Sequence, residues 1–419
     1  MTSPAPSSPI WHPFTQHALT PEFPLVSRGE GVWLETDKGR LLDAISSWWV
    51  ITHGHRHPKI VEAIKAQADQ LDQAIFANLT HQPAEDVASE LIRIAPRGLS
   101  HVFFSDSGST SVEVALKMAL GFWNNQPKPR TRIIALEHAY HGDTVGTMSA
   151  GARGVFTTPY APLLFDVVRL PFPHAGREQE TLDLLKEVAR DAAALVVEPL
   201  ILGSGGMLMY PPEVLRALAI ICRRNGALFI ADEVMTGFGR TGTMFACKQA
   251  GVSPDILCLA KGLTGGSLPL AVTLCTPEIF QAHYSEDRSR TFFHSSSFTA
   301  NPIACAAARA NLEIWRTEPV MDRIARLCAM QEERLARFRA DSSFGDVRRL
   351  GTITALDLKV PDPGYLAGIG PRMMAFFLER GVLLRPLGNT IYVMPPYGIT
   401  AAELDLVYDA IAAAAGAFV

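Results

Sequence analysis

One lysine of the chain, Lys261, stands at the end of an apolar run and directly before a glycine-rich turn, in the stretch PDILCLAKGLTGGSLPLAV (residues 254–272). Burial of a strongly hydrated ammonium is costly and lowers its pKa, because desolvation disfavours the charged form. Two interpretations are open at this point. Either the side chain lies along the fold and keeps its charge in water, or its amine is a nucleophile.

Two other apolar runs end in polar residues that could act together with this lysine. ALFIADEV ends in Asp232 and Glu233; either could cap the strand or bind a metal, but a carboxylate leaving so apolar a run usually needs a partner, such as a protonated ring nitrogen. FFSDSGSTSVEVA passes from a predicted strand through Ser107, Gly108 and Ser109 into a predicted helix. The N–H groups and dipole of such a helix N-terminus suit a phosphate, although ordinary capping explains this stretch equally well when it is taken alone.

A phosphate cradle, a carboxylate and a lysine at successive strand ends are together the parts of a pyridoxal phosphate site. Lys261 would form the Schiff base with the cofactor, and Asp232 would keep the pyridine nitrogen protonated so that the ring can accept electrons. Ligands of open parallel sheets bind beyond the carboxyl ends of the strands, where these residues are expected.

The elements that must position these residues alternate between short β-rich runs and helical patterns, most clearly from about residue 60 to residue 310. Such alternation predicts an α/β fold with a mostly parallel sheet covered by helices. We expect a large cofactor-binding domain over residues 61–310 and a smaller domain over residues 311–419. An N-terminal segment, residues 1–60, is expected to contribute to the small domain and to the active site.

The composition limits the class of protein. With 419 residues, of which 48% are hydrophobic and 19% charged, the chain can bury a large core. Its formal charge of −4 gives no basic field for nucleic acid. The six cysteines lie too far apart in sequence for a metal knuckle or a compact disulfide framework, and no apolar segment is long enough to span a membrane. We therefore expect a cytoplasmic protein without a metal.

Three further motifs require interpretation. GFGRTG (residues 237–242) has the spacing of a dinucleotide fingerprint but not its early βαβ position, so nicotinamide binding is not expected. HGHRHP (residues 53–58) has three alternating histidines with no cysteine or carboxylate nearby, which favours a loop with incidental histidines over a metal site. Tyr140, in HAYHGDT (residues 138–144), is followed by a glycine and an acid, which indicates a loop at the site, although an aromatic residue here could also belong to the core.

The stretches LFIADEVMTGFGRTGTMFAC and PDILCLAKGLTGGSLPLAV resemble the signature of class III aminotransferases, and the resemblance extends over nearly the whole chain, including AYHGDT and EPLILGSGGM. It implies a PLP-dependent transferase of fold type I, the aspartate-aminotransferase type, with a large mostly parallel sheet domain and a smaller α+β domain. It also implies pyridoxal 5'-phosphate as cofactor, and a homodimer with active sites at the subunit interface.

Three outlying stretches, IWHPFTQ, SSWWVITHGH and RPLGNTIYVMPPY, are similar to the branch of this family that converts 8-amino-7-oxononanoate to 7,8-diaminononanoate in biotin biosynthesis. The catalytic and cofactor-binding residues that this resemblance implies are Lys261, Asp232, Tyr140, Ser107, Gly108 and Ser109, with Ser296 and Ser297 reaching the phosphate of the neighbouring subunit. The implied substrate-binding residues are Phe14, Trp48, Trp49, Tyr140, Lys261, Ser295, Arg385 and Tyr392. A long apolar keto acid needs such aromatic walls and one cation, although without the family core packing would be the preferred explanation of the tryptophans.

Two positions depart from the family pattern. Phe14 stands where the opening motif usually has tyrosine, so a hydroxyl at the substrate is absent. The strip HSSSF has serines where relatives often have glycine, proline and threonine, but Ser297 keeps a hydroxyl for the phosphate.

We expect a ping-pong transamination with S-adenosylmethionine as amino donor and with lysine as the alternative donor. The rival functions are an omega-amino-acid or diamine transaminase, an aminomutase, and a non-catalytic binding protein on the same fold.

Overall fold

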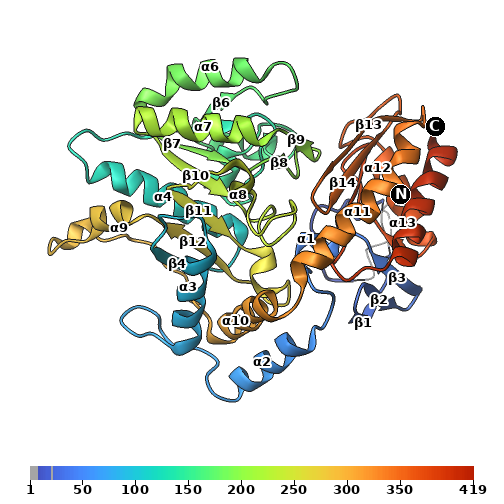
Figure 1. Ribbon diagram of the computed structural model, residues 1–419, viewed down its shortest axis with the longest axis horizontal. Helices are drawn as coiled ribbons and strands as arrows, with labels where there is room; N and C mark the ends of the chain where they lie inside the picture. The colour runs from blue at the N-terminus through green and yellow to red at the C-terminus, as the bar shows by residue number, and fades with distance from the viewer. Residues whose placement is uncertain (1–7, 20–21) are drawn as a thin grey trace.

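The computed structural model describes residues 8–19 and 22–419. The largest sheet of this part has seven strands in the order β4-β12-β11-β10-β7-β5-β6, and β12 alone runs antiparallel to its neighbours (Figure 1). The strands are β4 (His101–Ser105), β5 (Arg132–Leu136), β6 (Val168–Leu170), β7 (Ala192–Val197), β10 (Leu228–Asp232), β11 (Ile256–Leu259) and β12 (Ala271–Cys275). The expected large, mostly parallel sheet is confirmed.

Helices cover both faces of this sheet, so its central strands are apolar on both sides. Along β7, Leu195 and Val197 belong to one hydrophobic core, whereas Ala194 and Val196 belong to another, because successive side chains of a strand point to opposite faces. The helices of this part are α2 (Pro58–Ala68), α3 (Gln82–Ile94), α4 (Gly108–Asn124), α5 (Val145–Ala150), α6 (Glu178–Val188), α7 (Pro212–Asn225), α8 (Ala246–Ala250), α9 (Pro277–His283) and α10 (Pro302–Thr317).

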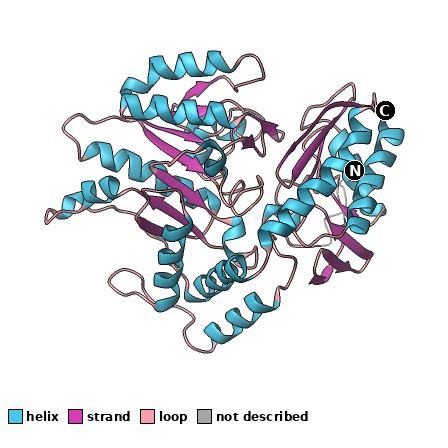
Figure 2. Cartoon of the chain, in the orientation of Figure 1, coloured by secondary structure: helices cyan, strands magenta, loops and turns pink. Residues whose placement is uncertain are grey.

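A smaller part of the molecule combines both ends of the chain (Figure 2). In one sheet, of order β1-β2-β3-β15, strand β3 pairs in parallel with β15, which lies more than 300 residues further along the chain. A second, antiparallel sheet has the order β13-β14-β16. The elements are β1 (Val26–Glu30), β2 (Trp33–Thr36), β3 (Gly39–Asp43), α1 (Ser46–Trp49), α11 (Val320–Arg339), β13 (Phe344–Leu350), β14 (Ile353–Leu358), α12 (Ile369–Glu379), β15 (Val382–Leu383), β16 (Thr390–Val393) and α13 (Ala401–Phe418).

Short elements complete the chain. The hairpin of β8 (Ile201–Leu202) and β9 (Leu208–Met209) follows β7, and 3-10 turns occur at η1 (Thr158–Leu163), η2 (Ala189–Asp191), η3 (Lys261–Thr264) and η4 (Arg288–Arg290). The proposed boundary at residue 310 falls within α10, and the division into domains stays a prediction. Among the residues that the structure describes, no helix is both long enough and apolar enough to cross a bilayer.

Candidate active site

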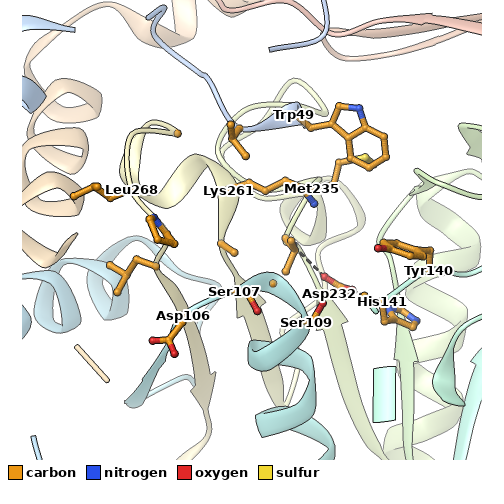
Figure 3. Close-up of a pocket in the computed structure, with 18 of the residues that line it drawn as sticks. Trp49, Asp106, Ser107, Ser109, Tyr140, His141, Asp232, Met235, Lys261 and Leu268 are labelled. Atoms are coloured by element: carbon orange, nitrogen blue, oxygen red, sulfur yellow. Dashed lines mark hydrogen bonds and ion pairs between the residues drawn. The ribbon is translucent and has the colours of Figure 1, made fainter. Parts of the chain in front are cut away.

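A cavity of about 420 Å³ lies at the carboxyl ends of β4, β10 and β11 (Figure 3). Parallel strands that end at the same edge of a sheet bring together residues far apart in sequence. The cavity is lined by all six cofactor residues expected within one subunit: Ser107, Gly108, Ser109, Tyr140, Asp232 and Lys261.

Lys261 opens the 3-10 turn η3 directly after β11, with a positive φ of 41°. Positive φ is strained for a residue with a Cβ, so the surroundings must hold this conformation. The buried Asn311 does so from α10: its side-chain N–H groups donate to the carbonyls of Gly262 and Leu263, each at 2.9 Å. The Lys261 amine is directed into the cavity, 5.2 Å from the centroid of the Trp49 ring (Figure 3).

Burial lowers the pKa of the Lys261 amine, and the nearby carboxylates of Asp232 and Glu198 only partly oppose this effect. An amine with a lowered pKa is more often uncharged near neutral pH, and the uncharged form is the nucleophile and the base. The interpretation of Lys261 as a side chain that merely keeps its charge in water does not fit this environment.

Asp232 ends β10 and is almost fully buried, with an exposed fraction of 4%. Its Oδ2 is 2.7 Å from Nδ1 of His141, and its Oδ1 accepts from the backbone N–H of Val234 at 3.1 Å. Desolvation acts to lower the pKa of His141, but the hydrogen bond and the charge of Asp232 outweigh it, so the pKa is raised. His141 thus places an Nδ1–H donor on one oxygen of Asp232, and a carboxylate at this position is suited to hold a protonated ring nitrogen.

Glu198 is a site residue that the sequence reasoning missed. It follows β7, and its carboxylate accepts from the backbone N–H of Tyr140 at 2.9 Å and of Gly203 at 3.0 Å. Burial raises its pKa to about 7. The signal was present in the sequence, since Glu198 ends an apolar run as Asp232 does.

Tyr140 is held by hydrogen bonds at its backbone and at its hydroxyl. Its N–H donates to Glu198, and its hydroxyl donates to Asp143 at 2.9 Å. Burial, together with the charge of Asp143, raises the pKa of the phenol, so the hydroxyl stays protonated. The loop position expected from the sequence is found: Tyr140 lies between β5 and α5, at the wall of the cavity.

The N-terminus of α4 fits a phosphate. Ser107 is the N-cap and accepts from the N–H of Thr110, so it does cap the helix, as the alternative interpretation held. Gly108 and Ser109 line the cavity from the first turn of this helix, where backbone N–H groups have no acceptor within the helix. The backbone of Gly108 lies so close to Val234 that a Cβ on residue 108 would be 2.6 Å from a Val234 methyl carbon. Capping and phosphate binding therefore use different groups of one turn, and the residues present fit pyridoxal phosphate.

A second cavity, of about 360 Å³, shares Trp49, Tyr140 and Lys261 with the first. It contains all the expected substrate residues except Ser295, namely Phe14, Trp48, Trp49, Tyr140, Lys261, Arg385 and Tyr392. It also contains residues that the sequence reasoning did not identify, among them Phe156, Ser204 and Tyr365.

Arg385 is the only lysine or arginine besides Lys261 among the described residues that line this second cavity. Its guanidinium carbon lies 4.8 Å from the Trp48 ring centroid, and one N–H donates to the carbonyl of Phe14 at 3.4 Å. No carboxylate of the described residues lies within 4.0 Å of it. A guanidinium that is stacked on an aromatic ring and has no anionic partner is suited to bind a ligand carboxylate.

The two tryptophans follow a strained turn. Ser46, Ser47 and Trp49 all have positive φ, and the buried Asp43 holds the turn by accepting from the N–H and the hydroxyl of Ser47. Trp49 is buried and donates from its indole to the hydroxyl of Tyr392 at 3.0 Å, whereas Trp48 stays 39% exposed. Core packing therefore explains the burial of Trp49, but it does not explain the exposed position of Trp48.

Ser295, Ser296 and Ser297 line neither cavity within the chain. Ser295 and Ser297 are exposed, and the carbonyl of Ser297 accepts from Gln73 at 2.6 Å. Their expected place at the substrate and at the phosphate of a neighbouring subunit stays a prediction.

Two of the three histidines of HGHRHP make structural contacts, so the expectation that they are incidental is wrong for these two. His55 lies 2.8 Å from a carboxylate oxygen of Asp43, and His53 lies 2.9 Å from the side-chain oxygen of Asn311. Within residues 8–19 and 22–419, no group of three or more metal-ligating side chains is close enough to hold an ion. In GFGRTG, the buried Arg240 donates to the carbonyls of Trp49, Ile51 and Pro395, which ties this motif to the tryptophan turn.

Comparison with known proteins agrees with this geometry. The family model described as aminotransferase class-III matches residues 15–415. An adenosylmethionine-8-amino-7-oxononanoate aminotransferase of Synechococcus elongatus is 47% identical over 97% of this chain and 98% of its own length. The one from Nitratidesulfovibrio vulgaris is 44% identical over 94% of this chain and 78% of its own length.

Solved structures give the same result. The crystal structure of adenosylmethionine-8-amino-7-oxononanoate aminotransferase from Methanocaldococcus jannaschii is 36% identical and superimposes with a TM-score of 0.93, covering 98% of this chain and 97% of the other. A PLP-bound amine transaminase from an uncultivated Pseudomonas species is 34% identical with a TM-score of 0.92, covering 98% and 99%. The fold is that of fold type I PLP-dependent transferases. The chain belongs to the class-III aminotransferase family, whose members transfer amino groups with pyridoxal phosphate as cofactor.

Proposed function

We propose that this chain transfers an amino group to 8-amino-7-oxononanoate, giving 7,8-diaminononanoate in biotin biosynthesis, with S-adenosylmethionine as amino donor. The observation that carries this proposal is Arg385, stacked on Trp48 in an aromatic cavity that continues to the Lys261 amine. Such a cavity suits a ligand with a carboxylate at one end, an apolar chain, and a reacting carbonyl at the other end. The relatives from Synechococcus elongatus and Methanocaldococcus jannaschii are named for the same reaction, which supports the proposal.

The residues of the chain have separate parts in this reaction. Pyridoxal phosphate, when bound, supplies the electron sink for the carbon that loses its proton. Lys261 would hold the cofactor between reactions and, when its amine is free, move the proton at the reacting carbon, which the lowered pKa of that amine favours. Asp232 would hold the ring nitrogen, supported by His141, and the first turn of α4 would hold the phosphate.

The amine transaminase from the uncultivated Pseudomonas species has nearly the same fold similarity, so the fold alone does not select the substrate. The test is to incubate the cofactor-loaded protein with 8-amino-7-oxononanoate and one donor at a time, and to measure the diamine by mass spectrometry. We expect diamine with S-adenosylmethionine. Diamine with lysine alone would change the donor, and turnover of only simple ω-amines with pyruvate would refute the proposed function.

A homodimer belongs to this proposal. The segments 72–79 and 291–301 are joined by hydrogen bonds from Gln73 and Asn301, and they carry exposed apolar side chains beside the serine strip. These side chains are Ile75, Leu79, Phe293 and Phe298, which are 57–68% exposed in the single chain. A second copy would cover them and bring Ser296 and Ser297 toward another cofactor site, which sedimentation equilibrium would test. The expected cytoplasmic location is tested by cell fractionation.

A further inference from the structure

The loop between β14 and α12 brings Tyr365 to the second cavity, far from any motif that the sequence reasoning used. This loop is tied to the turn that carries Arg385: the N–H of Asn389 donates to the carbonyl of Pro363 at 3.2 Å. Gly388 has a positive φ of 62°, and a Cβ at this position would collide with the same carbonyl. One turn therefore positions both the cation of the cavity and Tyr365.

Tyr365 continues an aromatic wall that is built from four segments distant in sequence. Its ring centroid lies 4.6 Å from that of Phe156 in an edge-to-face contact. Phe156 in turn meets Phe14 at 5.7 Å, and Phe14 meets Trp48 at 5.8 Å, both edge-to-face. Tyr365 and Phe156 are absent from the three hydrophobic cores of the described residues, so the pair packs at the cavity and not in the interior.

We infer that Tyr365 and Phe156 determine the specificity of this cavity for a long apolar carboxylate. Arg385 attracts any carboxylate, so its charge cannot distinguish a long chain from a short one. Selection among carboxylates of different length must come from apolar contacts along the wall, and each methylene that loses such a contact changes discrimination by roughly 10-fold or more. This inference rests on the proposed function, because it names the residues that select its acceptor.

The test compares chain length in binding and in turnover. Isothermal titration calorimetry on cofactor-loaded protein measures the Kd of nonanoate and of hexanoate, and steady-state kinetics measures KM and kcat for 8-amino-7-oxononanoate. For Tyr365→Ala we expect roughly tenfold weaker binding of nonanoate, less than about twofold weaker binding of hexanoate, and a raised KM at nearly constant kcat. Phe156→Ala should act in the same way, and the double variant should lose less than the product of the two single losses.

Two control variants separate the ring from general effects. Tyr365→Phe keeps the ring and should stay within about twofold of the parent in every readout. Tyr284→Ala removes an exposed tyrosine that lines neither cavity and should change nothing. An unchanged ratio of the nonanoate and hexanoate affinities in Tyr365→Ala would overturn the inference, and so would an equal weakening of both ligands accompanied by a lower unfolding temperature. If the parent protein makes no diamine but the affinity ratio shifts as expected, the proposed function fails while the chain-length selection stands.

Discussion

Replacing Asn311 with alanine should damage the site without touching any ligand. The side chain of Asn311 is fully buried and makes three hydrogen bonds, each of 2.9 Å: two to the carbonyls of Gly262 and Leu263, and one with Nε2 of His53. Burial lowers the pKa of His53 to about 4, so the ring is neutral at pH 7. Because the amide nitrogen of Asn311 already donates twice, its oxygen must accept from His53, which fixes the proton on Nε2.

The size of the effect follows from these bonds. Three intramolecular hydrogen bonds at about 1 kcal/mol each predict a loss of about 3 kcal/mol in the free energy of unfolding. The strained backbone of Lys261 would also lose its support, and a displaced amine predicts a kcat lower by roughly 10²-fold. Urea unfolding at fixed protein concentration measures the first effect, and single-turnover kinetics of the cofactor-loaded protein measures the second.

Asn225 provides a control, since it is also an asparagine of a helix but is only part-buried and makes one side-chain bond, to the carbonyl of Ile221 at 2.9 Å, remote from both cavities. Asn225→Ala should cost about 1 kcal/mol and leave kcat unchanged. If Asn311→Ala destabilises the protein no more than this control and keeps its kcat, then η3 does not depend on α10 and the reasoning is wrong.

Three further outcomes are expected. Lys261→Ala should lower turnover by at least about 10³-fold while the unfolding temperature is kept, and full steady-state activity would exclude Lys261 as the reacting amine. Arg385→Lys should raise KM for the keto acid by roughly 10-fold or more at nearly constant kcat, because a lysine cannot form the bidentate pair; equal KM values would remove Arg385 from carboxylate recognition. Folding raises the pKa of Glu198 from 4.5 to about 7, so the folded protein binds this proton more tightly and loses about 3 kcal/mol of stability as the pH rises through that window. Glu198→Gln cannot ionise and should gain that amount relative to the parent between pH 4.5 and 8; parallel stability curves from urea titrations would contradict the assignment.

The strand-end residues could be predicted from the sequence because topology, and not detailed packing, brings them together. Asp232 ends one parallel strand and Lys261 follows its neighbour, so the pattern of apolar runs was enough to place both at one edge of the sheet. Glu198 follows a third such strand and could have been found by the same criterion.

The rest of the site depends on contacts between distant segments that carry no periodic signal. Tyr365 and Phe156 lie on loops more than 200 residues apart, and one of these loops packs against the Gly388 turn, which is itself distant in sequence from Phe156. Asn311 lies in the middle of α10, where an asparagine in a helix pattern gives no indication that it holds the turn after β11. The roles of such residues depend on tertiary packing, which local sequence patterns do not reveal.

The protonation of Lys261 follows from the desolvation of its amine and from the charges around it. Burial and the nearby Arg240 both lower its pKa, whereas Asp232 and Glu198 raise it, and the lowering effects are larger. Arg240 is itself buried and donates to three backbone carbonyls, and no carboxylate of residues 8–19 and 22–419 forms an ion pair with it within 4.0 Å. Two of these carbonyls belong to Trp49 and Ile51, so the same guanidinium that positions the tryptophan turn also disfavours the ammonium form of Lys261. Placement of a lysine at the end of an apolar strand, costly for a structural residue, therefore gives an amine that is poised to lose its proton.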